Sequence, residues 1–477
     1  MSAIRSRKRS RLALAVAGAV LAIAVLVALL SGGAAPPPPL PLPGAGRPAR
    51  GGNPFAYSPS REAEFEARAA AGSAHVLFTK SPGGAIATAA RVASYRGAVS
   101  AATRGTEIDP DMLEAIVFLE SAGRPQVIAG NDPSAAAGLT QILAQTGQAL
   151  LGMHVDLARS RQLTAAIYRA SALGASGLVS ALVRRRAKID DRFDPSKALA
   201  ATVRYLELAR QRLGRSDLAV VSYHMGIGNL QQVLADYDGG HAIPYAQLYF
   251  DTSPDHGRAA YELLSSFGDD SSLYYWRILG AIAIMRLYRS DRTELSRLAA
   301  LQTADGYGAE ALHPPDRTPS FGNPDALDRA YASHTILPLP SNAGHLGLSY
   351  GPGMGSLAPR LGAPAALYRG LRAPALDLLI ELAARVRALS RSSTPLIVAS
   401  TVTDARYQEL VGFTDSPATT GYTFQIARRY ASRGQALALQ ATLDRLQELD
   451  LIAWVRGAQT IEVTVASDAS QAIVDGI

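Results

Sequence analysis

One carboxylate, Glu120, stands where the pattern of residues favours general acid chemistry. Asp109 is a good helix N-cap and Pro110 suits the first helical position, so a helix is predicted to begin here. Its apolar residues recur at helical spacing, and Glu120 follows Ile116 by four residues, beside that apolar face. Partial desolvation raises a carboxyl pKa, as a general acid near neutral pH requires. The alternative is a paired or snorkelling Glu; Glu114, on the opposite face, is predicted to be an ordinary solvated acid.

The elements expected to position Glu120 are this helix, a loop of small residues and two later helices. Gly123 and Pro125 are predicted to end the first helix. The following loop contains Asp132, the nearby acid that could serve as a second carboxylate. A later helix is expected to deliver Tyr223, although a Tyr in an apolar run is, on physical grounds alone, a core residue.

Three blocks of sequence resemble, in the right order, the soluble lytic transglycosylases over roughly residues 95–260. The blocks are Glu120-Ser121, Ala137-Gly138-Leu139-Thr140-Gln141-Ile142 and Ser222-Tyr223-His224-Met225-Gly226. The chain departs from the family pattern at Thr140 (usually Met), Ser222 (usually Ala) and His224 (usually Asn), and the last position lies close to the sugar site in the family.

The resemblance implies a mainly α, lysozyme-like transglycosylase domain in which Glu120 is the catalytic residue. It also implies that Tyr223 hydrogen-bonds near the catalytic carboxyl and that Gly226 ends its helix beside the groove. The predicted substrate-binding residues are Ser121, Gly138, Gln141, Tyr223, His224 and Gly226.

Most glycosidases need two carboxylates, whereas a lytic transglycosylase needs one. In the implied reaction this one carboxylate acts first as the acid and then as the base. Glu120 would protonate the glycosidic oxygen between N-acetylmuramic acid and N-acetylglucosamine, and then deprotonate the muramyl 6-hydroxyl to close a 1,6-anhydro ring. No metal and no cofactor are expected. If Asp132 acts as a second carboxylate, the reaction becomes hydrolysis of the goose-type lysozyme kind. The other alternative is a non-catalytic peptidoglycan-binding scaffold.

The composition sets the class of partner. The 477 residues suffice for two or three domains, and the net charge of +7 occurs without a dense basic block interleaved with aromatics. This fits anionic cell-wall or membrane surfaces better than nucleic acid, so peptidoglycan strands, the membrane and proteins of wall synthesis or envelope assembly are the expected partners. The absence of Cys excludes disulfides, thiolate metal sites and a lipid-modified N-terminal Cys.

The N-terminal region predicts the location. A basic tail, residues 1–11, precedes residues 12–30, which carry no charge and are about long enough to cross a membrane as a helix. The expected protein is a single-pass protein of the cytoplasmic (inner) membrane, with its N-terminus inside and the bulk of the chain periplasmic or extracytoplasmic. The rival is a cleaved signal peptide with its cleavage site near Gly33-Ala34-Ala35.

The rest of the chain divides by composition. Residues 31–60 form a Pro/Gly-rich linker, and residues 61–301 a helical lytic transglycosylase-like domain. Within it, the run Arg184-Arg185-Arg186 is predicted to be a solvated face rather than a site. An irregular connection over 302–365 is followed by a small α+β domain over 366–477.

This last region resembles the zinc D-Ala-D-Ala carboxypeptidase and dipeptidase fold. The resemblance rests on VASTVTDARYQELV, SPATTGYTFQI, and LIAWV with IEVTV. The ligand positions of that family correspond to Ala418, Gln425 and Glu462, while Gly421 is retained, and no His follows His345. Two of three ligands cannot coordinate zinc, so the predicted domain is a pseudopeptidase that holds no metal.

Overall fold

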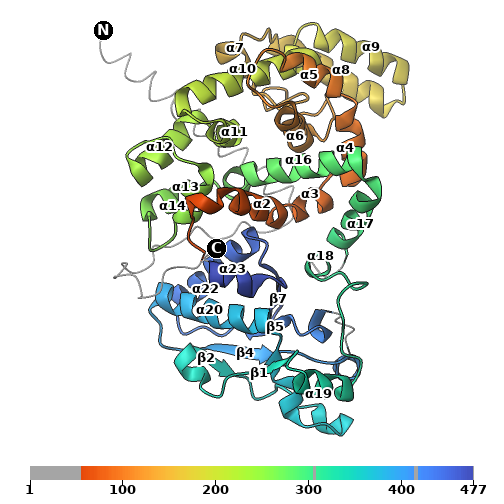
Figure 1. Ribbon diagram of the computed structural model, residues 1–477. Helices are drawn as coiled ribbons and strands as arrows, with labels where there is room; N and C mark the ends of the chain where they lie inside the picture. The colour runs from red at the N-terminus through yellow and green to blue at the C-terminus, as the bar shows by residue number, and fades with distance from the viewer. Residues whose placement is uncertain (1–54, 305–307, 413–416, 476–477) are drawn as a thin grey trace. The chain divides into compact units, whose positions relative to one another are not determined.

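The computed structural model describes residues 55–304, 308–412 and 417–475, and these are mostly helical with a small sheet region (Figure 1). The expectation of a mainly α chain with a smaller α+β part is confirmed at this level. The predicted basic tail, the apolar stretch 12–30 and most of the linker lie outside the described residues. Within the described ranges, none of the helices has the length and apolar character needed to span a membrane.

The described chain divides into two units, and it passes from one to the other inside helix α6 (Pro110–Ser121). Unit 1 contains Tyr95–Leu113 and Gly123–Tyr205. Unit 2 contains residues 55–94 together with Glu114–Ala122 and Leu206–Ile477. The predicted domain boundaries are a different division, based on composition, and stay a prediction.

Unit 1 is helical and packs around a small apolar cluster that includes Ile128, Ala137 and Phe193. Helix α8 carries Leu163 and Ile167 on its buried face. The helices of this unit, besides the start of α6, are α5 (Arg96–Ala102), α7 (Ala144–Leu150), α8 (Leu157–Ala172), α9 (Ser176–Ala187) and the larger part of α10 (Pro195–Leu213).

The helical part of unit 2 is built on aromatic packing around Trp276, which is fully buried. Tyr245 and Phe250 pack against its indole with ring centroids at 5.3 and 5.5 Å, and Phe65 packs on Phe250 at 5.1 Å. These helices are α2 (Glu62–Gly72), α3 (His75–Thr79), α4 (Ala85–Ala93), α11 (Ser216–Met225), α12 (Ile227–Asp238), α13 (Tyr245–Asp251), α14 (Arg258–Ser266), α15 (Asp269–Ser272), α16 (Tyr274–Ser290), α17 (Arg292–Gln302) and α18 (Ala309–Leu312).

The remainder of unit 2 contains a five-stranded sheet in the order β2-β4-β5-β7-β6, in which only the β2–β4 pair is parallel. Figure 1 shows α20, α22 and α23 together on one side of this sheet. The strands are β2 (Leu348–Tyr350), β4 (Leu396–Ser400), β5 (Thr423–Ala427), β6 (Ile452–Arg456) and β7 (Thr460–Val465), with a separate pair β1 (Leu337–Pro338) and β3 (Gly370–Leu371). The helices are α19 (Pro324–Ala332), α20 (Ala373–Ser390), α21 (Ala405–Val411), α22 (Arg433–Glu448) and α23 (Ala469–Asp475).

Candidate active site

Hydrogen bonds at both ends of helix α6 fix the position of the helix that carries Glu120. The Asp109 carboxylate accepts a hydrogen bond from the Asp111 amide at 2.8 Å, and Pro110 is the first helical residue, as predicted. At the other end Arg91 of α4 donates from Nε to the Ala122 carbonyl at 2.8 Å. A cation at a helix C-terminus satisfies a carbonyl that the helix leaves free. The hydrogen bond from Arg91 therefore fixes the backbone just after the last turn of α6, which carries Glu120.

The carboxyl group of Glu120 has one described hydrogen-bond donor, the phenol of Tyr274. Tyr274 Oη donates to Glu120 Oε1 at 2.7 Å from the first residue of α16. Glu120 is half-buried, and desolvation raises its pKa to about 7, while the hydrogen bond from Tyr274 acts in the opposite direction. A carboxyl with this pKa is present both protonated and ionised at neutral pH, which suits transfer of a proton in either direction.

The Tyr274 ring stacks with the rings of two residues of the third sequence block. Its centroid is 6.4 Å from that of Tyr223, with 19° between planes, and 5.3 Å from that of His224, with 28° between planes. His224 is exposed, and its Nδ1 is 3.0 Å from the Ser271 hydroxyl. The structure thus brings Glu120, Tyr223 and His224 to one place in unit 2, with Tyr274 as the link. Tyr274 is a site residue that sequence reasoning did not assign.

The environment of Glu114 corrects a prediction. Its side chain is 1% exposed and pairs with Arg289 of α16, Nη1 to Oε2 at 2.5 Å. The prediction of a solvated acid assumed one apolar face, but residues 113–118 of α6 are all buried. A helix buried on every side has no solvated face, so the carboxylate needs a cation. Glu114 is an internal ion-pair residue of the helix that carries Glu120.

The second sequence block forms a loop of unit 1 that is closed by its own polar groups. The Gln141 side-chain amide donates to the carbonyls of Val127, at 3.1 Å, and Gly138, at 2.8 Å. Gly138 has φ +84°, and a Cβ there would lie 1.8 Å from the Arg192 carbonyl oxygen. Only glycine fits this backbone and this close approach. Gly138 and Gln141 therefore shape the loop that the resemblance assigns to the groove.

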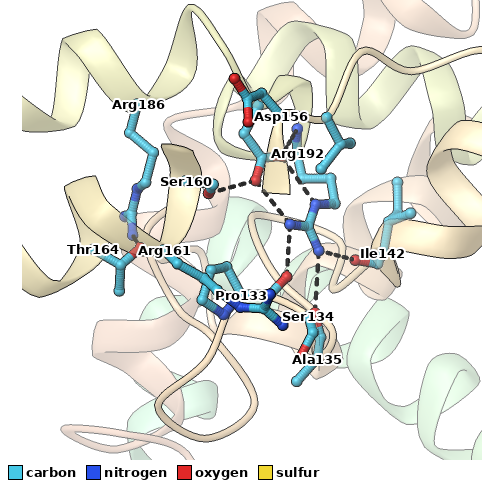
Figure 2. Close-up of polar contacts among 12 residues, drawn as sticks. Pro133, Ser134, Ala135, Ile142, Asp156, Ser160, Arg161, Thr164, Arg186 and Arg192 are labelled. Atoms are coloured by element: carbon cyan, nitrogen blue, oxygen red, sulfur yellow. Dashed lines mark hydrogen bonds and ion pairs between the residues drawn. The ribbon is translucent and has the colours of Figure 1, made fainter. Parts of the chain in front are cut away.

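A buried ion pair supports the same loop, as Figure 2 shows. Arg192 and Asp190 are both fully buried, with Nη2 to Oδ2 at 2.7 Å. The rest of the guanidinium donates to the carbonyls of Pro133, Ala135 and Ile142 at 2.7 to 3.3 Å. Because three loop carbonyls accept hydrogen bonds from one guanidinium group, these bonds fix the conformation of the loop backbone.

The remaining predicted residues have simpler surroundings. Ser121 is buried, and its hydroxyl donates to the Val117 carbonyl at 3.3 Å. Gly226, at φ +87°, ends α11. Asp132 of unit 1 is 52% exposed, and Arg161 together with the Ser134 amide lowers its pKa to about 2. Asp132 is therefore an ionised surface acid at all ordinary pH values.

The zinc-ligand positions of the C-terminal resemblance do not fit zinc. Gln425 and Glu462 face each other on β5 and β7, and Gln425 Nε2 donates to Glu462 Oε2 at 2.8 Å. Ala418 offers only a methyl group, and it lies in a short 3-10 turn. Within the described ranges, no three His, Asp or Glu side chains gather as a metal site would require. A methyl group and an amide bonded to one carboxylate do not supply the imidazole and carboxylate ligands of the resembled zinc site.

Comparison with known proteins finds a family match over part of this chain. Residues 160–243 match the family model described as the transglycosylase SLT domain. The match begins within α8 and ends shortly after α12. It contains Tyr223, His224 and Gly226, whereas Glu120, Gly138 and Gln141 precede it. It supports a lytic transglycosylase-like domain, and in general a lyase activity of the lytic transglycosylase type on peptidoglycan. No curated protein and no solved structure matches the chain significantly.

Proposed function

We propose that this protein is a lytic transglycosylase that cleaves the β-1,4 bond between N-acetylmuramic acid and N-acetylglucosamine and leaves 1,6-anhydro-muramic ends during cell-wall remodelling. The observation that carries the proposal is the half-buried carboxyl of Glu120, with its pKa raised to about 7 and one hydrogen bond from Tyr274. A single carboxyl poised in this way serves a reaction that needs an acid first and a base second.

The proposed steps return Glu120 to its starting state. The protonated carboxyl gives its proton to the glycosidic oxygen, the bond to the muramyl C1 breaks, and the N-acetylglucosamine end leaves as an alcohol. The carboxylate then takes the proton of the muramyl 6-hydroxyl as that oxygen bonds to C1. The acetamido group of the sugar is expected to assist, as the resemblance implies. The Tyr274 hydrogen bond stabilises the carboxylate that exists between the two steps.

In this proposal the residues of the three sequence blocks bind the substrate. His224 supports this assignment because its exposed ring rests on Tyr274 and is therefore close to the carboxyl group. Gly138 and Gln141 contribute through the loop that they shape, and Ser121 and Gly226 through the helix ends that they form.

The location is part of the proposal. Residues 12–30 would anchor the protein in the cytoplasmic membrane, with the basic tail inside and the catalytic part outside at the wall. The C-terminal domain would be a pseudopeptidase that binds wall peptides. The Gln425–Glu462 hydrogen bond supports this view, because it occupies two of the positions where the resembled family holds its metal.

The test is mass spectrometry of the products of purified peptidoglycan digested with the full-length protein and with Glu120→Gln. We expect muropeptides with 1,6-anhydro-muramic ends from the wild type and none from the variant. Reducing muramic ends would indicate a hydrolase and would make Asp132→Asn the next variant. Absence of any product, with binding to the wall intact, would contradict an enzyme and leave the scaffold.

A further inference from the structure

Helices α8 and α9 form a hairpin in unit 1 whose tip carries apolar side chains that the core does not use. Leu163 and Ile167 are buried on the inner face of α8. In contrast, Tyr168, Leu173 and Leu178 are 49%, 83% and 53% exposed, on both sides of the turn between the helices. Single exposed apolar residues need no explanation, but three large ones within eleven residues form a patch.

The same hairpin is strongly and uniformly basic. Residues 157–188 contain seven Arg and Lys and no Asp or Glu, a charge equal to the net +7 of the whole chain. Two of the seven have partners: Arg186 is buried and donates to Thr164 and Gln126, and Arg161 pairs with Asp132. The other five are exposed and make no ion pair with any described residue: Arg159, Arg169, Arg184, Arg185 and Lys188.

Charge and apolar surface lie together on the hairpin. Arg185 follows Leu178 by seven residues, so the two side chains share one side of α9. Arg161 precedes Tyr168 by the same spacing on α8. Five exposed cations without ion-pair partners favour contact with an anionic surface, and a soluble anionic polymer would leave Leu173 in water. An anionic bilayer satisfies both, because headgroups neutralise the cations while the acyl boundary receives the apolar tip.

We propose that the α8–α9 hairpin is a membrane-contact element that docks on the surface of an anionic phospholipid bilayer, with Leu173 and Leu178 inserted at the interface and the basic side chains on the headgroups. This does not depend on the catalytic role of Glu120. It also differs from anchoring by residues 12–30, since it concerns a surface of the folded unit.

The absence of cysteine allows a direct test in the full-length protein. Leu173→Cys is labelled with an environment-sensitive fluorophore and mixed with vesicles of phosphatidylcholine alone or in equal parts with phosphatidylglycerol. The difference between the two vesicles reports contact that depends on anionic lipid, and the charge variants below separate the hairpin from the basic tail, residues 1–11. We expect a blue-shifted emission, and quenching by a lipid-borne quencher, only with the anionic vesicles.

Matched variants separate a specific contact from general charge attraction. A label at Val474→Cys, where the side chain is 79% exposed in α23, is expected to show no shift. Arg184→Glu with Arg185→Glu is expected to abolish the shift at residue 173, whereas Arg429→Glu with Arg433→Glu, an equal charge change at exposed residues of unit 2, should preserve it.

Three results would overturn the proposal. The first is an unshifted emission at residue 173 with anionic vesicles, in a protein whose circular dichroism is unchanged. The second is the same shift with Val474→Cys, or the same loss with the Arg429 and Arg433 variant. The third is a shift given equally by soluble polyphosphate and insensitive to the lipid-borne quencher, which would identify a contact with an anionic polymer instead.

Discussion

Removal of one hydroxyl, in Tyr274→Phe, tests the origin of the chemistry assigned to Glu120. The phenol donates to the carboxylate at 2.7 Å. Desolvation raises the pKa of Glu120 and this bond lowers it, and with both acting the pKa is about 7. The variant keeps the ring, and with it the stacking on Tyr223 and His224. Without the hydroxyl, desolvation still raises the pKa of Glu120 and the hydrogen bond that lowers it is lost, so the pKa must rise.

The size of the change follows from the strength of the bond. A hydrogen bond to a charged group contributes about 1.5–3 kcal/mol, and about 1.4 kcal/mol corresponds to a tenfold change in a proton equilibrium. The pKa of Glu120 in the variant should therefore lie about one to two pH units higher. The lower value is expected, since Glu120 is only half-buried and water can replace part of the lost bond.

The assay is kcat/KM for release of anhydro-muropeptides as a function of pH, which reports the free enzyme. The first step needs the protonated carboxyl, so kcat/KM of the wild type should fall as the pH rises through about 7. In Tyr274→Phe this fall should occur about one pH unit higher.

The control is the same chemical change one residue along the chain. The Tyr275 hydroxyl donates to Glu66 at 2.9 Å, away from Glu120, so Tyr275→Phe should leave the midpoint of the fall unchanged. A midpoint for Tyr274→Phe that stays at the wild-type pH or moves lower would refute the reasoning. An equal shift in Tyr275→Phe would show that the effect is not specific to this hydrogen bond.

Three further changes probe the structure that holds the site. The folded-state pKa of Glu120 is raised to about 7 from an unfolded value of about 4.3, so its ionisation destabilises the fold as pH rises through this window. Glu120→Gln should therefore raise Tm relative to the wild type at pH about 8 and not at pH about 4, by an energy of at most about 4 kcal/mol. Arg192→Ala should lower the free energy of unfolding by about 3–5 kcal/mol, because it leaves a buried carboxylate without its cation. Gly138→Ala should cost more than about 3 kcal/mol and abolish glycan cleavage, because its Cβ would overlap the Arg192 carbonyl.

The Arg192 and Gly138 changes each have a counterpart that should cost less. Arg161→Ala breaks an exposed pair and should cost at most about 1 kcal/mol in denaturant unfolding. Gly174→Ala has a similar positive φ in open space, so it should cost only the backbone strain of about 1–2 kcal/mol. Equal costs for Arg192→Ala and Arg161→Ala would contradict the role of burial. A tolerated Gly138→Ala would contradict the close approach, and a Glu120→Gln effect equal at both pH values would contradict the raised pKa.

The sequence predicted those parts of the site whose structure depends on residues close together in the chain. The bounds of α6 follow from Asp109, Pro110 and Gly123, whose capping and turn chemistry acts within a few residues. The helical character of the chain before Gln302 and the small α+β part near its C-terminal end were also predicted. Sequence blocks of this kind also carry the resemblance, which agrees with the family matched over 160–243.

What the sequence did not predict depends on distant partners. Tyr274 lies 154 residues after Glu120, and nothing in its neighbourhood distinguishes it from the core aromatics Tyr275 and Trp276. The burial of Glu114 requires Arg289, which is 175 residues away. Helical periodicity predicts which face of a helix packs against a single surface. It cannot predict that α6 is buried on all sides, because that depends on other helices.

The 154-residue separation between Glu120 and Tyr274 has a consequence for the time course of synthesis. A nascent chain that has emerged as far as Gly226 already contains all three sequence blocks and still lacks α16. In such a chain Glu120 would titrate like any unfolded glutamate, with a pKa of about 4.3, and would hold almost no proton at neutral pH. Long-range contacts of this kind form late in folding. A growing chain therefore lacks the raised pKa of Glu120, on which the proposed activity depends, until α16 has folded onto α6.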